Sequence, residues 1–478
     1  MIGRKKETEE LNELYESDKA ELVAIYGRRR VGKTYLVNNV FKDKITFGHA
    51  GLAPDENESA EKQYKGQLEQ FYSSLLLCGM VEGSIPKNWI EAFLMLEKLL
   101  MSKNTDDRQV VFLDELPWMD TPGSDFIKAF EGFWNSWGCH RDNLMVIVCG
   151  SANSWILDKL INNHGGLYNR VTYEIKLLPF SLHECEEFYK SKHIGFTRYD
   201  IVQSYMAVGG TPYYMGYMKR GLSLAQNIDR LFYEKGAKLN DEYVRLFSSV
   251  FDKPHLVERI VRFLSTRNYG YTRAEISEGT GISSGGWLSE ILRSLLASDM
   301  IVKYVPFDVS KRKEHYRLVD PFCIFYLKYV EGNPGADESF WQKNHNTQSV
   351  VSWRGIAFEN VCFNHIKQIK TALGVSGVTT SHSAWIRNED GETGLQIDLL
   401  IMRNDNVVNM CEIKFLSDDF TVDEKYYRVL LRRQDELVKK VSRKTSIQST
   451  LITTFGLKKN EYSGIFSNTV TLEDLFTI

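Results

Sequence analysis

Cysteine is scarce in this chain of 478 residues, and no two of its cysteines have the C-x-x-C spacing of a zinc site. The seven cysteines are scattered and odd in number, and several lie inside apolar runs, as Cys149 does after Val146-Ile147-Val148. Cysteines in such settings are typical of reduced core thiols rather than of a disulfide framework. We therefore expect an intracellular, cytoplasmic protein without structural disulfides.

A secretory signal and a long apolar run are also missing. The first residues, Met1-Ile2-Gly3-Arg4-Lys5-Lys6-Glu7, are charged and lack the apolar centre of a signal peptide. No apolar stretch approaches the ~20 residues that a membrane helix requires. We expect no membrane partner.

An excess of basic residues is the third absence, because the formal net charge is −3. The overall balance does not indicate nucleic acid, so any basic surface must be local. The hydrophobic content of 43% and the charged content of 25% are ordinary for a soluble globular protein. The length predicts about three domains.

The most informative stretch that is present has the pattern G-x-x-x-x-G-K-[ST] and reads Gly27-Arg28-Arg29-Arg30-Val31-Gly32-Lys33-Thr34. An apolar run at 22–26 precedes it, and helical spacing of apolar residues begins at Tyr35. In this order of strand, loop and helix, backbone N–H groups face a phosphate at the helix N-terminus. We expect Lys33 to reach the β- and γ-phosphates and the Thr34 hydroxyl to hold Mg²⁺.

Five apolar runs alternate with helical patterns in residues 1–180 and predict an α/β domain with a parallel sheet. The runs lie at 22–26, 45–50, 110–113, 144–149 and 173–178. The third run leads into Asp114 and Glu115, which is typical of a Walker B strand. We expect Asp114 to bind Mg²⁺ with Thr34, and Glu115 to polarise the attacking water.

Two further polar positions have open interpretations. Ser151, in the sequence Gly150-Ser151-Ala152-Asn153, either contacts the γ-phosphate or the water, or simply ends a strand in small turn residues. Arg170 either acts as an arginine finger, in the same chain or towards a neighbouring subunit, or forms a surface ion pair.

Several of these segments together resemble the prokaryotic "archaeal ATPase" family of AAA+/STAND P-loop NTPases. They are Ile2-Gly3-Arg4 with Glu7 and Leu11, the loop at 27–34, Leu113-Asp114-Glu115, Gly150-Ser151, and Leu178-Pro179-Phe180-Ser181. The resemblance implies ATP as the ligand, with Ile2 and Arg4 in the segment against the adenine. The absence of a guanine-reading N/T-K-x-D motif in the first domain also favours ATP over GTP.

Residues 181–250 read as a helical lid and residues 251–335 as a winged helix-turn-helix. In the lid, Gly209-Gly210-Thr211-Pro212 resembles the element whose proline lies behind the adenine in STAND proteins, but the same run is a common helix break. The winged helix consists of helices at 256–264, 273–278 and 287–297 and a hairpin at 301–305 and 315–318. Its basic turn, Ser310-Lys311-Arg312-Lys313, either contacts a phosphate backbone or belongs to an internal packing module.

A second group of polar residues lies in residues 340–478. Glu359 falls on an amphipathic helix, Asp398 at the head of a strand, and Glu412 and Lys414 on one face of the neighbouring strand of a hairpin. Carboxylates that converge suit a divalent cation such as Mg²⁺ or Mn²⁺, for which we expect Asp398 and Glu412 as ligands. A lysine beside them can orient a hydroxide or stabilise developing charge.

This pattern resembles the PD-(D/E)xK restriction-endonuclease-like superfamily, and the region resembles the C-terminal domain attached to archaeal ATPases. The resemblance implies a nuclease site of Glu359, Asp398, Glu412 and Lys414, with basic residues of the helix at 427–440 along the phosphates. Ile397 replaces the proline that many members carry. The alternative is a surface hairpin with solvated charges.

The first hypothesis is therefore an ATP-hydrolysing protein whose nucleotide state controls a metal-dependent DNA nuclease domain. The second is an ATP-driven switch or scaffold whose C-terminal domain binds nucleic acid or a protein without cutting. A GTPase-like signalling module conflicts with the Asp114-Glu115 pair. The family resemblance allows an oligomer as well as a monomer.

Overall fold

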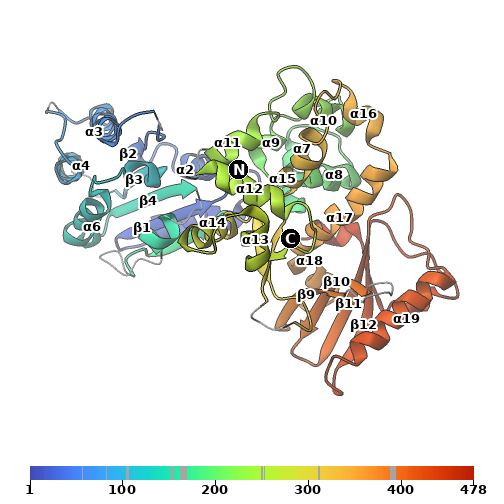
Figure 1. Ribbon diagram of the computed structural model, residues 1–478. Helices are drawn as coiled ribbons and strands as arrows, with labels where there is room; N and C mark the ends of the chain where they lie inside the picture. Colours follow the sequence, from blue (N-terminus) through green and yellow to red (C-terminus); the bar gives the residue numbers. More distant parts are fainter. Residues whose placement is uncertain are drawn as a thin grey trace. The chain divides into compact units, whose positions relative to one another are not determined.

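The computed structural model describes residues 1–55, 57–81, 83–103, 107–151, 155–161, 169–248, 251, 253–309, 313–387 and 395–478. The chain forms two compact units (Figure 1). The first comprises Met1–Pro179, Val244–Pro254 and Ser289–Asp299. The second comprises Phe180–Tyr243, His255–Leu288 and Met300–Ile478.

The first unit is built on a five-stranded parallel sheet with the order β2-β3-β4-β1-β5. Its strands are β1 (Glu21–Gly27), β2 (Ile45–Ala50), β3 (Gln109–Asp114), β4 (Leu144–Ser151) and β5 (Tyr173–Lys176). Each predicted apolar run is a strand, and the parallel α/β prediction is confirmed.

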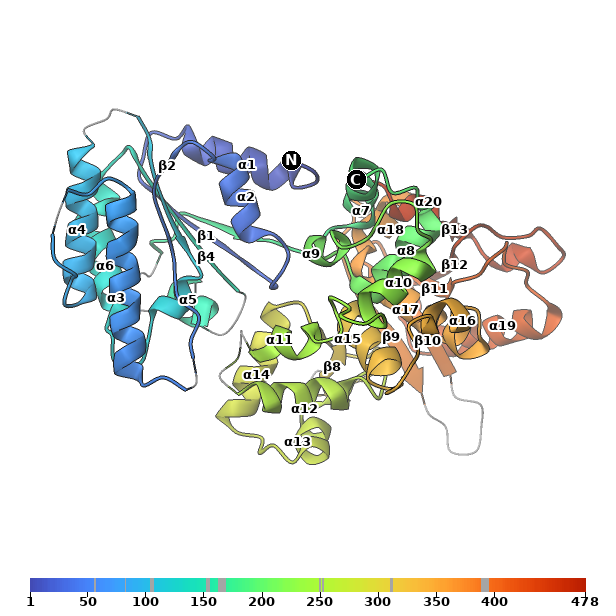
Figure 2. The ribbon, with the colours of Figure 1, turned by 90° about the horizontal axis from the view of Figure 1, so that it is seen from above.

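Helices cover both faces of this sheet, because alternate strand residues point to opposite sides (Figure 2). One face packs against α1 (Lys5–Tyr15) and α2 (Lys33–Val40), and the other against α3 (Ala60–Leu77), α4 (Trp89–Ser102) and α6 (Phe126–Ser136). Val23 and Ile25 belong to the first core, and Leu22 and Ala24 to the second. The side chains of Ser59 and Asn88 cap α3 and α4 by accepting backbone N–H groups.

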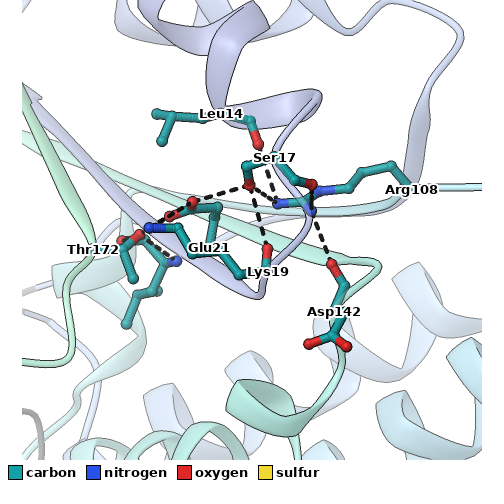
Figure 3. A network of polar contacts seen from close by, with 8 residues as sticks. Leu14, Ser17, Lys19, Glu21, Arg108, Asp142 and Thr172 are labelled. Atoms are coloured by element: carbon teal, nitrogen blue, oxygen red, sulfur yellow. Dashed lines mark hydrogen bonds and ion pairs between the residues drawn. The ribbon is translucent and has the colours of Figure 1, made fainter.

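A polar network fixes the strand ends opposite the glycine loop (Figure 3). The Arg108 guanidinium donates to the carbonyl oxygens of Ser17, Asp142 and Leu14 at 2.7, 2.9 and 3.1 Å. The buried Glu21 carboxylate accepts from the hydroxyls of Ser17 and Thr172. The network therefore ties α1 to β1, β3, β4 and β5 without using any residue of the loop.

The second unit begins with short helices whose starts the sequence encodes. They are α7 (Leu182–Ser191), α8 (Arg198–Val208), α9 (Pro212–Met215), α10 (Leu224–Phe232), α12 (Pro254–Leu264) and α13 (Arg273–Thr280). Capping boxes open α7, α8, α10 and α13, as in Ser181 with Glu184. The strands β6 (Tyr271–Thr272), β7 (Ile301–Tyr304) and β8 (His315–Leu318) form a small sheet with the order β6-β8-β7.

Two helices of the expected lid and winged helix are divided between the units. They are α11 (Glu242–Ser248) and α14 (Gly286–Ala297), whose residues from Val244 and from Ser289 onwards belong to the first unit. Arg293 of α14 pairs with Asp158 of the first unit at 3.0 Å. Arg293, which lies on the third helix of the expected winged helix-turn-helix, therefore already has an acidic partner.

The C-terminal part of the second unit carries a mixed five-stranded sheet with the order β13-β12-β11-β10-β9. The segment α15 (Pro321–Phe325), η3 (Tyr326–Val330) and α16 (Phe340–Asn344) leads to it. Its strands are β9 (Thr380–Arg387), β10 (Leu395–Arg403), β11 (Val407–Lys414), β12 (Ser446–Thr453) and β13 (Asn468–Val470). Its helices are α17 (Gln348–Asn364), α18 (Ile366–Ala372), α19 (Glu424–Val438) and α20 (Leu472–Leu475).

Packing places α17 and α19 against this sheet through different side chains. Leu437 of α19 packs with Leu400 and Met410, whereas Phe358 of α17 packs on Phe415, which follows β11. Across the described part of the chain, no helix is both long enough and apolar enough to span a bilayer.

Candidate functional site

The glycine loop joins the end of β1 to the start of α2, as the sequence predicts. Gly27 lies close to the backbone of the segment that follows β5, because a Cβ there would lie 2.2 Å from the Leu177 carbonyl oxygen. Gly32 has φ +94°, which favours glycine, and Arg30 also has a positive φ of 72°. The two glycines are therefore required by the backbone of the loop itself.

Lys33 and Thr34 open α2 and face the end of β3 in different ways. The Lys33 ammonium is buried and donates to the carbonyl oxygens of Gly27 and Arg28 at 3.2 Å each. Burial lowers the pKa of Lys33, while the nearby Glu115 and Asp114 carboxylates oppose that shift. The Thr34 hydroxyl donates to Asp114 Oδ2 at 2.7 Å. A hydroxyl and a carboxylate thus lie side by side where a magnesium ion bound to triphosphate would require oxygen ligands.

Glu115 and Ser151 meet because β4 lies between β1 and β3 in the sheet. Ser151 is the register partner of Gly27, and its backbone N–H donates to the Glu115 carboxylate. Glu115 itself has φ 47°, and burial raises the pKa of its carboxyl, with Lys33 opposing the shift. Ser151 is the last residue of β4, as the strand-end interpretation expects, and its contact with a γ-phosphate or water stays a prediction. Asn153 lies outside the described residues.

Arg4 contacts the loop backbone. Its buried guanidinium donates to the carbonyl oxygens of Val31 and Leu178 at 3.2 and 2.6 Å and pairs with Glu7 at 3.6 Å. Arg4 therefore braces the glycine loop, and its position against an adenine, like that of Ile2, stays a prediction.

The other loop residues differ in exposure. Arg28 and Val31 are buried, Arg29 and Arg30 are half-buried, and Tyr35 is 65% exposed. The contact of Tyr35 with a nucleotide stays a prediction.

Two predicted ATP-site residues come from other segments of the chain. Arg170 is exposed in a turn before β5. Pro212 is the first residue of α9 in the second unit, where the preceding Gly210 packs on Phe180. The finger and adenine roles of Arg170 and Pro212 stay predictions.

The four predicted acidic-site residues gather in the second unit. Asp398 lies within β10, not at its head as expected, because β10 begins at Leu395 and the pairing with β9 shifts register between Ile397 and Leu400. Its Oδ2 accepts from the Ile413 backbone N–H at 3.1 Å, which ties β10 to the E-x-K strand β11.

Glu412 is surrounded by donors. Lys414 Nζ and Arg433 of α19 each lie 2.5 Å from its carboxylate oxygens, and the Tyr426 hydroxyl donates to the same carboxylate. Glu359 of α17 pairs with Arg317 of β8 at 3.7 Å, and Arg317 also donates to Asn360 at 2.5 Å. Three carboxylates are thus balanced by three basic side chains from β8, β11 and α19.

The pKa shifts show that these carboxylates act on one another. Burial, with the Asp398 charge as the next cause, raises the pKa of Glu359 to about 8. Burial and the Glu412 charge raise the pKa of Asp398 to about 6. A divalent cation would relieve this repulsion, so the donor set suits Mg²⁺ in charge and in oxygen chemistry. Nevertheless, within the described residues no group of three or more His, Cys, Asp or Glu side chains is placed to hold a metal ion.

Arg317 and Tyr426 were not predicted from the sequence as members of this group. Arg317 lies far from the E-x-K motif in sequence, and only the packing of β8 on α17 brings it near. The one available signal was the basic and polar character of α19, which pointed to Arg433 but to phosphates rather than to Glu412.

One family model matches the N-terminal part of the chain. Residues 1–218 match the family described as "ATPase domain predominantly from Archaea". The uncharacterized protein MJECL04 of Methanocaldococcus jannaschii is 23% identical over 439 residues, which cover 91% of each chain. The uncharacterized ATP-binding protein MJ0423 of the same organism is 44% identical over 44 residues, 9% of this chain and 75% of that protein.

Similar solved structures include the Walker-type ATPase PABY2304 of Pyrococcus abyssi, with 16% identity and a TM-score of 0.45 over 69% of this chain and 96% of that one. The ORC2 protein of Aeropyrum pernix in its ADPNP–ADP complexes has 12% identity and a TM-score of 0.39 over 73% and 96%. The match of residues 1–218 to the ATPase-domain family found predominantly in Archaea, together with the loop at 27–34 that contacts Asp114, supports a P-loop ATPase domain in this part of the chain.

Proposed function

We propose that this protein hydrolyses ATP with Mg²⁺ at residues 27–34 and 114–115, and that its nucleotide state controls a metal-dependent DNA nuclease domain at the C-terminus. The single observation that carries the ATP part is the 2.7 Å hydrogen bond between Thr34 and Asp114, with Lys33 and Glu115 beside it. It joins the two motifs that ATP hydrolysis requires.

The residues have separate tasks in this proposal. The loop amides and Lys33 bind the phosphates, and Thr34 and Asp114 hold Mg²⁺, which neutralises charge on the transferring phosphoryl group. Glu115 orients the attacking water, and the Ser151 backbone N–H that it accepts fixes its carboxylate. A raised pKa brings Glu115 closer to the pH at which a base works well.

The nuclease part is supported by the neighbouring strands β10 and β11, where Asp398 accepts from the Ile413 N–H and Lys414 pairs with Glu412. Besides burial, the Asp398 charge also helps to raise the pKa of Glu359. Asp398 and Glu412 would hold Mg²⁺ or Mn²⁺, and Lys414 would stabilise negative charge at the scissile phosphate. The order α17, β9, β10, β11, α19, β12 agrees with the restriction-endonuclease-like resemblance.

Control by nucleotide is supported by the composition of the second unit. The lid helices α7 and α8 share it with the C-terminal sheet, and the Leu182 backbone N–H donates to His365 Nε2 at 3.1 Å. A lid that responds to ATP would therefore carry the acidic cluster with it.

The alternative, a switch or scaffold that binds without cutting, has a specific observation in its favour. Glu412 already has Lys414, Arg433 and Tyr426 as partners, so a metal ion must compete with them. In this alternative the cluster stabilises the domain, and DNA or a protein binds elsewhere.

Plasmid DNA incubated with Mg²⁺ or Mn²⁺, with and without ATP, separates the two. The nuclease is supported if the wild-type chain cleaves DNA, Asp398→Asn does not, and the exposed control Asp405→Asn still does. Lys33→Ala should in addition change the response of cleavage to ATP. Cleavage that survives Asp398→Asn would show contamination. DNA retention without cleavage would favour the switch.

Hydrolysis rates per chain that rise with protein concentration would support Arg170 as a finger between subunits.

A further inference from the structure

Gln67 is a buried polar residue of α3 that no motif includes. It is 2% exposed, and its side chain amide is fully engaged with backbone atoms. Its Oε1 accepts from the Leu52 N–H at 3.0 Å, and its Nε2 donates to the carbonyl oxygens of Leu52 and Trp118 at 2.8 Å each. One side chain therefore joins α3, the segment after β2, and the short helix α5 (Leu116–Met119) that directly follows Glu115.

The turn that contains Glu115 is packed closely on the same side. A Cβ on Gly51 would lie 2.9 Å from the Glu115 carbonyl oxygen and 3.2 Å from Trp118 and Met119. The Gly51 N–H donates to the Asp114 carbonyl oxygen, and the Trp118 N–H to that of Glu115, both at 3.0 Å. Gly51 has no positive φ, so the absence of its side chain serves packing rather than backbone conformation.

The turn is also held from β4, where a Cβ on Gly150 would lie 2.8 Å from Pro117. Glu115 needs this support because its φ of 47° is unfavourable for a residue with a side chain. A strained residue keeps its conformation only when its surroundings determine it.

We infer that Gln67, together with the close approach of Gly51, is a positioning residue for Glu115 in ATP hydrolysis. It acts through the backbone of the 115–119 turn and does not touch the nucleotide. The inference rests on the proposed role of Glu115. In this inference α3, which lies outside both nucleotide motifs, affects the rate of ATP hydrolysis and not the binding of ATP.

The test compares two disturbing variants with two matched controls. Gln67→Met keeps the approximate side-chain volume and removes all three hydrogen bonds. Its control, Gln63→Met, makes the same change one turn earlier, where the side-chain amide donates to the carbonyl oxygens of Asp55 and Glu58. Gly51→Ala pushes on the turn directly, and Gly48→Ala adds the same methyl on β2, where it meets only Ile45 at 3.5 Å. The measurements are kcat per bound nucleotide and the Kd for mant-ATP, both with Mg²⁺.

We expect Gln67→Met and Gly51→Ala to lower kcat about tenfold with a Kd within about twofold of wild type, because a misplaced catalytic group slows chemistry more than binding. The controls should leave both values unchanged. An unchanged kcat in a folded Gln67→Met or in Gly51→Ala, or a parallel loss of kcat and binding, overturns the inference. Gly51→Ala decides alone if Gln67→Met does not fold. A wild-type chain that binds ATP without turnover would instead refute the proposed hydrolysis.

Discussion

At the scale of single residues, the ATP site depends on one short contact between two motifs that lie far apart in sequence. The Thr34 hydroxyl is tied to Asp114, and Glu115 to the Ser151 backbone. Both contacts exist because β4 separates β1 from β3, which brings the three strand ends into one row.

Removing the Thr34 hydroxyl tests its role as a magnesium ligand. Thr34→Val keeps the shape of the side chain but has no oxygen for the metal, so the Mg²⁺ concentration for half-maximal hydrolysis should rise about tenfold, whereas Thr34→Ser should resemble wild type. The measurement is ATP hydrolysis across a Mg²⁺ titration. Superimposable curves for Thr34→Val and wild type would contradict the assignment.

The buried His49 predicts a loss of stability in mild acid. Burial lowers its pKa to about 4 from the ordinary value of 6.5, and its Nδ1 lies 2.9 Å from the Ser74 hydroxyl. Since the unfolded chain takes up the proton first, this contribution is complete above pH 6.5 and shrinks as the pH falls towards 4, with about 2 kcal/mol lost at pH 5.

Thermal unfolding of the first unit at pH 7 and pH 5 checks this prediction. His49→Gln removes the titrating group and should show a smaller fall in Tm between the two pH values than wild type. An equal fall in both proteins would show that other groups cause the acid sensitivity.

At the scale of elements, local sequence patterns predicted most of the strands and helices. The apolar run at 144–149 became β4, a strand with neighbours on both sides and every residue buried, because fully covered parallel strands are continuously apolar. The capping boxes at Ser181 and Thr272 mark the starts of α7 and α13, because each cap side chain accepts a backbone N–H of the first helical turn.

Those local patterns could not predict contacts between elements that lie far apart in the sequence. Asp398 lies inside β10 rather than at its head, because β10 begins at Leu395 and ends at Arg403. Arg317 reaches Glu359, and Gln67 reaches Trp118, only through tertiary packing that no periodicity records. The glycine loop was predictable because its chemistry is contained in eight adjacent residues.

The Gly210–Phe180 contact gives a prediction for the element that starts the second unit. A Cβ on Gly210 would lie 2.0 Å from the Phe180 carbonyl oxygen, and the Phe180 N–H donates to the Gly210 carbonyl oxygen at 2.6 Å. Gly210→Ala should therefore destabilise the second unit by about 3 kcal/mol, since backbone must move.

The control is Gly355→Ala on α17, where an added Cβ meets nothing within 4 Å. Thermal unfolding should show a clear loss of Tm for Gly210→Ala alone. Equal Tm values for the two variants would contradict the packing of Gly210 on Phe180.

At the scale of the whole molecule, the two units have separate cores and share no simple cut point in the sequence. Val244–Pro254 and Ser289–Asp299 belong to the first unit although they lie beyond the expected ATPase boundary at residue 180. The four consecutive domains predicted from the sequence stay a prediction.

The division into two units predicts that ATP stabilises mainly the unit that holds the glycine loop. ATP with Mg²⁺ at a hundredfold excess over its Kd should stabilise the first unit by about 2.7 kcal/mol, and the proposed response of the lid helices should give the second unit a smaller shift. Calorimetry should then show two unfolding transitions that ATP shifts by different amounts. A single transition that moves as a whole would indicate that the units unfold together.

The most direct test of the central claim is phosphate release and ATP binding measured on the same preparations of wild type, Glu115→Gln and Lys33→Ala. We predict that Glu115→Gln binds ATP like wild type but hydrolyses it at least about a hundredfold more slowly, because it keeps the site and loses the base. Lys33→Ala should lose binding. Normal hydrolysis by Glu115→Gln, or normal ATP binding by Lys33→Ala, would contradict the assignment of residues 27–34 and 114–115 as the ATP site.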